Sequence, residues 1–470
     1  MNFFSRLEEH GTSAALIDDQ GRVLTYTDLT TQADELAEKL NDPSLVFLVP
    51  TNSTESVIFY IACLRSGIPL ALINEQSAAQ SLEALIQSYQ PSHICFPRDT
   101  EIPGNTNHVV TSIRESTIVE TNCRRDYEMN PDLALLLSTS GSTGSPRFVR
   151  LSMNNVLSNA ASIIESLGIR KEDRAITTLP MAYSYGLSII NTHLAAGASI
   201  VIGEFTVTQK PFWEILRNQE VTTFGGVPNT YEMLLRLRIG RMDLPSIRYL
   251  TQAGGRLNPE TAQKYCDIAT ERGWRFNMMY GQTEATARMS CVPFELLQMD
   301  TNNIGYAIPK GEFTLVDESG NTIDQPDMQG ELVYQGPNVC LGYATGCDDL
   351  TRGDDNQGKL HTGDLATRSE EGFFRIVGRK NRFLKLFGNR VNLDDVEQWV
   401  NSEIGECVCV GEDDRLQVYL TGTDWDTSDV KRKIAEFLHV HQSAIAVDTI
   451  EQIPRSDSGK IRYAELATRQ

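Results

Sequence analysis

The sequence predicts an α/β protein of the doubly wound type that is divided into two or more domains. Its 470 residues are more than one hydrophobic core of ordinary size accommodates. Short apolar segments alternate with amphipathic segments over most of the chain, a pattern typical of a parallel sheet with helices on both faces. The pattern changes near Leu315 and again near Gly378, which indicates different structure toward the C-terminus.

A strand and a helix are predicted on either side of a polar loop. Residues 132–137 (DLALLL) are predicted to form a buried strand. After the loop, Ser152 can cap a helix, because a serine side chain accepts a hydrogen bond from the first helical turn. This helix is predicted to end at Gly168. Its apolar face recurs at helical spacing in Val156, Ala160, Ile163 and Leu167.

The remaining elements follow in alternation. Residues 174–180 (RAITTLP) are predicted to form a strand, and residues 186–203 a helix, a glycine stop and another strand. From Leu315 the chain has short strands with turns. After Gly378 a smaller α+β unit is predicted, and we place the domain boundary near residue 380. Its elements are a helix at 394–405, strands at 407–411 and 416–422, and a helix at 429–439.

Composition limits the class of protein. The formal net charge is −20, and an acidic surface repels nucleic acid and anionic lipid, so neither is an expected partner. The N-terminal residues lack the apolar core of a signal peptide, and no apolar run reaches the length of a membrane span. Nine cysteines are scattered, and the only close pair, Cys407 and Cys409, fits zinc spacing poorly. We expect reduced thiols and a cytoplasmic enzyme.

The loop after the first predicted strand has the composition of an anion site. Residues 139–147 read TSGSTGSPR, with hydroxyl groups, two glycines and a cation directly after an apolar run. The spacing is neither that of a kinase-type P-loop nor G-x-G-x-x-G. A surface turn would have the same composition, so the loop alone does not define a function.

Together with other motifs, this loop closely resembles the phosphate-binding signature of the adenylate-forming superfamily. The superfamily includes acyl-CoA synthetases, peptide-synthetase adenylation domains and firefly luciferase. The further signatures follow in order along essentially the whole chain. They are residues 24–40 (LTYTDLTTQADELAEKL), 280–284 (YGQTE), 330–343 (GELVYQGPNVCLGY), 361–366 (HTGDLA), 378–391 (GRKNRFLKLFGNRV) and 453–463 (IPRSDSGKIRY).

The resemblance implies a fold and a reaction. The implied fold is a large N-terminal adenylation domain, residues 1–380, with doubly wound sheets and a small distorted β-barrel. A small mobile α+β domain, residues 381–470, follows it. The implied reaction joins a carboxylic acid to ATP, giving acyl-adenylate and pyrophosphate, and a thiol then takes the acyl group. Such an enzyme must neutralise phosphate charge, align the attack and exclude water.

The resemblance also implies which residues hold the phosphates and the metal. Arg147 stands where the family more often has lysine, and a guanidinium binds phosphate in a bidentate manner. Glu284 matches the magnesium-binding carboxylate, since Mg²⁺ prefers oxygen ligands. Thr283 is implied to bond the α-phosphate. Hydroxyls and backbone N–H groups of the loop are implied to cradle the β- and γ-phosphates: Thr139, Ser140, Gly141, Ser142, Thr143 and Gly144.

The nucleoside and the reacting carboxylate are assigned in the same way. Tyr280 is implied to stack near adenine, beside Gly254 and Gly255 of QAGGRL, where absent side chains allow close backbone approach. Asp364 matches the acceptor of the ribose hydroxyls, and Arg379 matches a ribose or phosphate contact. The resemblance places Lys460 of SGKIR beside the substrate carboxylate and the α-phosphate. A flexible ammonium can follow the charge through the transition state.

The family's C-terminal domain rotates between the two half-reactions, and Asn381 occupies the hinge position. Residues 378–392 carry five cations and no acidic residue, which suits CoA or the phosphopantetheine arm of an acidic carrier protein. A solvated basic face is the alternative interpretation. We assign Lys385 and Arg390 to this acceptor. The five cations are Arg379, Lys380, Arg382, Lys385 and Arg390.

The substrate and the function class follow from a few residues. Relatives that activate amino acids usually have an aspartate in the segment 181–186 (MAYSYG), which has none here. Room beside Gly225, Gly226, Gly254 and Gly255 would favour a fatty or aryl acid. We predict an ATP-dependent acyl-CoA synthetase. The alternatives are an acyl-carrier-protein ligase, a luciferase-like monooxygenase and a non-catalytic nucleotide-binding homologue. A non-catalytic homologue would have no chemical reason to keep Glu284, Asp364, Arg379 and Lys460 together.

Overall fold

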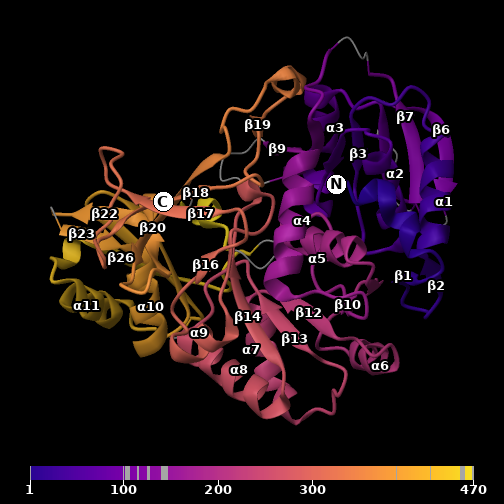
Figure 1. The fold of residues 1–470 in the computed structure, drawn as a ribbon. Coiled ribbons are helices and arrows are strands. Elements are labelled where there is room, and N and C mark those ends of the chain that lie inside the picture. The colour runs from indigo at the N-terminus through magenta and orange to yellow at the C-terminus, as the bar shows by residue number, and fades with distance from the viewer. Residues whose placement is uncertain are drawn as a thin grey trace. The chain divides into compact units, whose positions relative to one another are not determined.

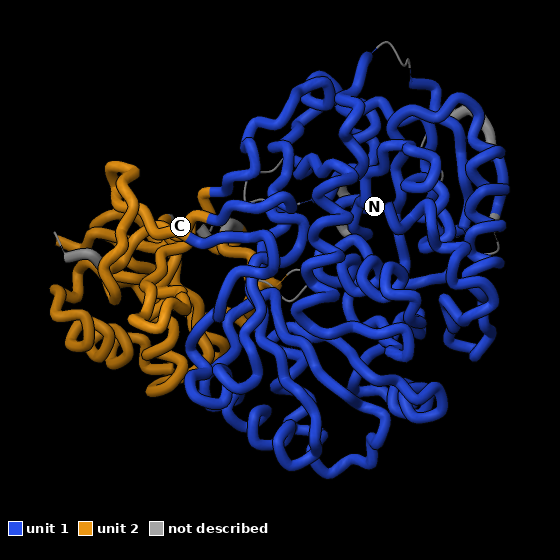
Figure 2. The backbone as a smooth tube through the Cα atoms, in the orientation of Figure 1, with its two compact units in different colours: residues 1–313, 334–360 blue, residues 314–333, 361–470 orange. Residues whose placement is uncertain are grey.

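The structure is a computed structural model, and its chain divides into two compact units. Unit 1 comprises residues 1–313 and 334–360, and unit 2 comprises residues 314–333 and 361–470 (Figure 2). The residues that the structure describes are 2–98, 100, 106–113, 116–123, 127–138, 147–387, 389–423, 425–455 and 461–467. Loop residues 139–144 and Lys460 therefore lie outside the described residues.

Unit 1 contains a nine-stranded sheet with the order β16-β15-β14-β13-β12-β10-β11-β1-β2 (Figure 1). All pairs from β14 through β12, β10 and β11 to β1 are parallel, as the strand–helix alternation predicts. The flanking pairs are antiparallel. The strands are β1 (Ala14–Ile17), β2 (Val23–Thr25), β10 (Arg174–Ile176), β11 (Ser199–Val201), β12 (Thr223–Gly226), β13 (Tyr249–Gln252), β14 (Arg275–Tyr280), β15 (Ser290–Cys291) and β16 (Tyr306–Ala307).

A second, eight-stranded sheet of unit 1 has the order β19-β9-β8-β4-β3-β5-β7-β6. The predicted strand at 132–137 is β8, and it pairs antiparallel with β9 because only the short loop 139–147 joins them. The strands are β3 (Val46–Leu48), β4 (Leu70–Leu72), β5 (His93–Pro97), β6 (Thr106–Ile113), β7 (Ser116–Thr121), β8 (Leu133–Ser138), β9 (Phe148–Ser152) and β19 (Gly342–Ala344).

Helices connect these strands, and the largest apolar cluster includes residues of both sheets together with α2 and α5. The helix predicted after Ser152 is α4. Ser152 and Asn155 form a capping box there, and Gly168 ends the helix in a left-handed conformation, as predicted. The helices are α1 (Tyr26–Ala37), α2 (Thr54–Arg65), α3 (Glu75–Tyr89), α4 (Met153–Leu167), α5 (Ser184–Ala195), α6 (Lys210–Asn218), α7 (Pro228–Arg236), α8 (Pro259–Arg272) and α9 (Phe294–Met299).

The chain after β16 is rich in short strands, as the sequence predicts. A four-stranded sheet, β17-β18-β20-β21, occupies the part of the chain expected to form a small distorted barrel. A hairpin and a three-stranded sheet, β24-β25-β26, follow with their own apolar core. The elements are β17 (Glu312–Val316), β18 (Gly330–Gln335), β20 (Lys359–Arg368), β21 (Phe374–Arg379), β22 (Phe383–Leu386), β23 (Asn389–Asn392), α10 (Leu393–Glu403), β24 (Cys407–Glu412), β25 (Arg415–Thr421), α11 (Thr427–Leu438), β26 (Ile445–Ile450) and α12 (Tyr463–Ala467).

Unit 2 contains both the residues around β20 and β21 and the elements after residue 380. The division at residue 380 therefore stays a prediction. Within the described part of the chain, no helix is both long and apolar enough to cross a membrane. The described residues also form short 3-10 helices: η1 (Phe4–His10), η2 (Ile239–Arg241), η3 (Thr283–Ala285), η4 (Cys347–Thr351), η5 (Lys380–Arg382) and η6 (Gln442–Ala444).

Candidate functional site

Three residues from three predicted motifs form a contact chain in unit 1. The Tyr343 hydroxyl donates a hydrogen bond to Glu284 Oε1 over 2.7 Å. The Arg147 guanidinium lies 4.1 Å from the centroid of the Tyr343 ring, the geometry of a cation–π contact. Burial, followed by the charge of Glu284, raises the pKa of Tyr343, so its hydroxyl keeps its proton and acts as the donor. The sequence analysis assigned roles to Arg147 and Glu284 and missed Tyr343.

The backbone explains why these residues meet. Strand β19 pairs antiparallel with β9, and Tyr343 is opposite Val149, so Tyr343 lies near the start of β9, where the loop 139–147 ends. Glu284 lies in η3, and the backbone carbonyl oxygen of Glu284 accepts a hydrogen bond of 2.8 Å from the Cys340 N–H. The Asn338 side chain donates to the Ala285 carbonyl over 2.9 Å. The segment 338–343 therefore holds the carboxylate and its tyrosine together.

The turn that carries Thr283 and Glu284 requires a glycine. A Cβ atom on Gly281 would lie 1.9 Å from the Ala287 carbonyl oxygen, closer than any real contact. Thr286 ends the turn with φ of +66°, and its hydroxyl donates to the Asn338 carbonyl over 2.7 Å. This close packing fixes the position of Glu284 relative to Tyr280, where β14 ends.

Thr283 and Tyr280 face different neighbours. The Thr283 and Ser184 hydroxyl oxygens lie 3.3 Å apart, and Ser184 is the first residue of α5. The Tyr280 hydroxyl accepts a hydrogen bond of 3.4 Å from Gln282 Nε2, and its ring lies 6.4 Å from that of Phe313. Tyr280 is partly exposed, as the predicted stacking against adenine requires.

The glycines near the end of β13 accommodate aromatic and proline side chains. Gly254 has φ of +83°, and a Cβ there would lie 2.5 Å from the Tyr183 hydroxyl. A Cβ on Gly255 would lie 3.1 Å from Pro228. At Gly225 it would lie 2.7 Å from the Tyr185 hydroxyl, and at Gly226 it would lie 2.9 Å from Thr230. The prediction of room for an acyl chain beside these four glycines is therefore wrong, because neighbouring side chains fill that space.

Unit 2 contains a second cluster. Asp364 and Arg379 are partners across β20 and β21, and Arg379 Nε donates to Asp364 Oδ1 over 3.0 Å. The Asp364 side chain is 3% exposed and that of Arg379 is 60% exposed. The Thr362 hydroxyl accepts from the Asp364 N–H over 3.1 Å, and Gly363 between them has φ of +71°. The predicted ribose contacts therefore form one ion pair.

Among the described side chains of residues 378–392, the cations do not form one basic surface. Arg382 is buried, donates to Asp394 over 2.8 Å and to Glu397 over 2.6 Å, and stacks on Tyr463 at 4.0 Å. Lys380 pairs with Glu331 at 3.1 Å. Lys385 is exposed, and it is opposite Arg390 in the β22–β23 hairpin. The side chains of Asn381 and Arg390 lie outside the described residues.

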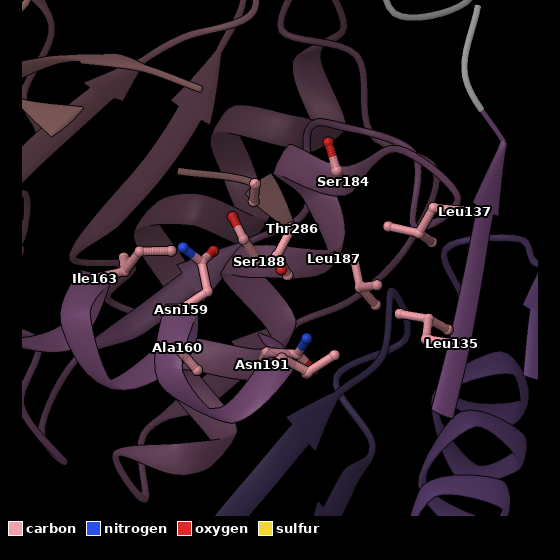
Figure 3. A pocket seen from close by; sticks show the side chains of 12 residues that line it. Leu135, Leu137, Asn159, Ala160, Ile163, Ser184, Leu187, Ser188, Asn191 and Thr286 are labelled. Carbon is pink, nitrogen blue, oxygen red and sulfur yellow. The ribbon is translucent and has the colours of Figure 1, made fainter. Parts of the chain in front are cut away.

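Two small cavities lie along α5 in unit 1. The first, of about 10 Å³, is lined by β8, α4, α5 and the segment 286–287 (Figure 3). Its polar residues are Asn159, Ser184, Ser188, Asn191 and Thr286. The second, of about 20 Å³, also includes Ser188 in its lining, together with Arg288 from the segment after η3. Each has room for about one water molecule.

Arg288 is the second residue that the sequence analysis missed. It is 3% exposed, its Nε has no hydrogen-bond partner, and its guanidinium lies 4.6 Å from the Tyr185 ring centroid. The only signal in the sequence is an arginine four residues after Glu284, and arginine is usually exposed.

Glu284 is a suitable ligand for magnesium, because Tyr343 bonds one carboxylate oxygen and the other could take the ion. Among the residues described, no group of three or more His, Cys, Asp and Glu side chains could hold a metal. A site at Glu284 would therefore share the ion with ATP phosphates and water, as Mg²⁺ commonly does.

The fold and these residues define a class. Gly254 and Gly255 follow β13, and Thr283 and Glu284 follow β14, so four of the assigned residues lie at the carboxyl ends of adjacent parallel strands, where α/β enzymes bind nucleotides. A family model described as "AMP-binding enzyme" matches residues 3–344. The chain belongs to this family.

Relatives and solved structures agree with the family. The chain is 25% identical over 498 residues to the medium-chain fatty-acid–CoA ligase of Escherichia coli, covering 95% of this chain and 86% of that protein. It is 26% identical to the D-alanine–D-alanyl carrier protein ligase of Lactiplantibacillus plantarum, covering 85% and 82%. The fold is similar to o-succinylbenzoate CoA synthetase (MenE) of Bacillus subtilis with its acyl-adenylate, with a TM-score of 0.80, 20% identity, and coverage of 99% and 97%.

Proposed function

We propose that this protein activates a carboxylic acid with ATP, releasing pyrophosphate, and transfers the acyl group from the acyl-adenylate to a thiol. The observation that carries the proposal is the Arg147–Tyr343–Glu284 contact chain. It joins a cation at the end of the loop 139–147 to a carboxylate of the YGQTE motif through one tyrosine. Membership of the AMP-binding family supports the same function.

In this proposal each described residue has a defined task. Arg147 binds phosphate charge, and its stacking on Tyr343 limits the positions that its guanidinium can adopt. Tyr343 fixes the Glu284 carboxylate, which holds the magnesium ion that neutralises phosphate charge. Thr283 donates its hydroxyl to the α-phosphate. Fixed donors and charges of this kind stabilise the transition state because they need no reorganisation during the reaction.

Residues of unit 2 have proposed tasks of their own. Asp364 accepts hydrogen bonds from the ribose hydroxyls, and Arg379, which holds Asp364 in place, contacts ribose or phosphate. We further propose that residues 381–470 rotate about Asn381 between the half-reactions, and that Lys460 acts in adenylation. MenE of B. subtilis has been solved with ATP and magnesium ion, and that precedent supports ATP and Mg²⁺ as ligands here.

The acceptor that we propose is CoA, with an acyl-carrier protein as the alternative. Both kinds of acceptor occur among the relatives, since one is named a CoA ligase and the other a carrier protein ligase. Lys385 is the exposed cation that we assign to the acceptor phosphates. We expect a cytoplasmic enzyme, and the free thiols of the described cysteines are compatible with a reducing compartment.

The substrate is proposed to be a carboxylic acid other than an α-amino acid. In the part of the chain that the structure describes, no aspartate or glutamate lines either cavity along α5. An α-amine would need such a carboxylate, because a buried ammonium without a partner is strongly disfavoured. The expectation of a fatty or aryl acid no longer rests on the glycines; it is supported by the fatty-acid–CoA ligase among the relatives.

The test is pyrophosphate release from ATP across a panel of carboxylic acids, followed by thioester formation with CoA and separately with a carrier protein. We expect pyrophosphate release that depends on an acid and on magnesium, and faster thioester formation with CoA. Nucleotide binding without pyrophosphate release for any acid would favour the non-catalytic homologue. Transfer to carrier protein alone would favour the carrier-protein ligase.

A further inference from the structure

The second cavity along α5 is lined by Arg288, whose guanidinium lies 4.6 Å from the Tyr185 ring centroid and is paired with no carboxylate in the described chain. Arg288 is 3% exposed. Its side-chain hydrogen bonding is limited to a long contact of 3.5 Å from Nη2 to the Ser188 hydroxyl, and its Nε has no partner. A buried cation without a carboxylate is unfavourable by several kcal/mol, so its presence calls for an explanation.

The polar neighbours of Arg288 are neutral. Burial raises the pKa of Tyr183 and that of Tyr185 to about 12, so both phenols are protonated near neutral pH. Burial also raises the pKa of Cys291 to about 11. Asp173, a buried carboxylate, already forms an ion pair with Arg248 and accepts a hydrogen bond from the Thr222 hydroxyl. Burial lowers the pKa of Arg288 from its usual value, as expected where no counter-charge is near.

The cavity beside Arg288 is polar on a second side. His193 Nδ1 lies 2.9 Å from the Ile189 carbonyl oxygen, which can only accept, so the proton is on Nδ1. His193 Nε2 is then an acceptor, and it is buried with no partner. Burial lowers the pKa of His193, which keeps the ring neutral. His193 and Arg288 both line the cavity of about 20 Å³. The Arg288 guanidinium is the group there that can donate to an anion, whereas His193 Nε2 can only accept.

Residues that line the two cavities lie between this charge and the Thr283 hydroxyl. Ser184 lines the first cavity (Figure 3) and lies 3.3 Å from the Thr283 hydroxyl. Ser188 lines both cavities and contacts Arg288. Ser184 and Ser188 are four residues apart on α5, a rise of about 6 Å. An acid whose reacting carboxylate lies beside Thr283 could therefore reach Arg288 with a group about one helical turn away.

From these observations we propose that Arg288 binds a second anionic group, a carboxylate, at the far end of the acid that this enzyme activates. The proposal rests on the function proposed above and narrows its substrate to dicarboxylic acids, short aliphatic or aromatic. The second carboxylate supplies the charge that Arg288 lacks in the free protein. The cavity has room for about one water molecule in the free protein, so binding of the carboxylate requires the side chains that line it to move apart.

The test compares matched acids in the pyrophosphate-release assay. Glutarate is paired with pentanoate, adipate with hexanoate, and isophthalate with 3-methylbenzoate. We expect at least one dicarboxylate to exceed its monocarboxylate partner in kcat/KM by about 10- to 100-fold, the range for a hydrogen bond to a charged group. Arg288→Met should bring that ratio close to one, and Arg288→Lys should retain part of it. Arg272→Met, on the exposed surface of α8, is the control and should leave the ratio unchanged.

Stability provides a readout that does not depend on catalysis. Met retains the apolar stem of the arginine and removes the charge, so ligand-free Arg288→Met should have a Tm equal to or above that of the wild type. Adding the preferred dicarboxylate should raise the Tm of the wild type and not that of the variant. A fall of several degrees in the ligand-free variant would show that the charge is compensated in the free protein, and would overturn the proposal.

The outcomes separate the two proposals. Activation of monocarboxylates with no dicarboxylate preferred would overturn the role of Arg288 and leave the proposed function intact. Equal loss for both members of each pair in Arg288→Met would mean that Arg288 acts on the reacting carboxylate or on the fold, which also overturns the inference. No pyrophosphate release from any acid would refute the proposed function itself, and this inference with it.

Discussion

Glu284 has one carboxylate oxygen bonded to the Tyr343 hydroxyl, and this geometry leads to the first two predictions. Glu284→Gln keeps the shape of the side chain and removes the negative charge that we propose binds the magnesium ion. We expect pyrophosphate release to fall by at least about 100-fold, as for loss of a preorganised charge in a site. The measurement is initial rate against magnesium concentration. Glu295→Gln, an exposed position in α9, is the matched control, and a wild-type rate in Glu284→Gln would remove Glu284 from the metal site.

Tyr343→Phe deletes only the hydroxyl that donates to Glu284. We expect kcat/KM for ATP to fall by about 10-fold, because one hydrogen bond to a charged group is lost while the ring still stacks under Arg147. Tyr343→Leu should have a larger effect, since it also removes the cation–π contact. Identical rates in both variants and the wild type would show that the contact chain does not position Glu284.

At the scale of elements, local signals were sufficient for α4 and insufficient for strand pairing. The serine, the apolar spacing and the glycine that predict α4 all lie within the helix or next to it. The antiparallel pairing of β19 with β9 joins residues about 190 positions apart, and no local pattern contains it. Tyr343 was missed for that reason. The glycines were misinterpreted because a missing side chain can accommodate a neighbour as well as a ligand.

The cap of α4 can be tested by stability. Ser152→Ala removes the hydroxyl that accepts from the Asn155 N–H over 3.1 Å, and Ser152 is buried. We expect the free energy of unfolding to fall by about 1–2 kcal/mol, as for other cap removals. Urea unfolding of the variant measures it. Glu165→Ala, exposed on the same helix, should change the value by less than about 0.5 kcal/mol.

The β22–β23 hairpin carries the proposed acceptor contact, and Lys385 is its exposed cation. Lys385→Glu should slow thioester formation with CoA far more than adenylate formation, and the wild-type thioester rate should fall as salt rises. Both half-reactions are measured on one preparation. Lys264→Glu, exposed on α8, makes the same change in net charge. Equal slowing of both half-reactions would assign Lys385 to ATP binding or to the fold.

At the scale of the whole molecule, the sequence predicted the fold class, and the roles that it assigned to the site residues stay predictions. Asp364 and Arg379 lie in short motifs and are partners in the structure. The loop 139–147 and Lys460 could be identified only by resemblance, and their roles stay predictions. The buried state of Arg288 could not be predicted, because burial depends on how α4, α5 and β14 pack, and the sequence records only that an arginine is present.

The proposed rotation of the C-terminal domain gives the prediction at this scale. Lys460→Ala should nearly eliminate adenylate formation from acid and ATP, by about 100-fold or more. It should still convert pre-made acyl-adenylate to thioester at close to the normal rate. The second assay controls for misfolding. Loss of both half-reactions to the same degree would argue against rotation, and loss of neither would argue against the role of Lys460.

The hydrogen bond between Tyr343 and Glu284 has a consequence for the order in which ligands arrive. Mg²⁺ requires six oxygen ligands in octahedral geometry, and the carboxylate has one oxygen already bonded to a phenol. Among the described residues no group of three or more His, Cys, Asp and Glu side chains could hold the ion, so most of the coordination sphere would come with the nucleotide. We therefore expect weak binding of the free ion in calorimetry without ATP. The ion and ATP should enter as one complex, so that the concentration of MgATP, and not that of free magnesium, governs occupancy of the site.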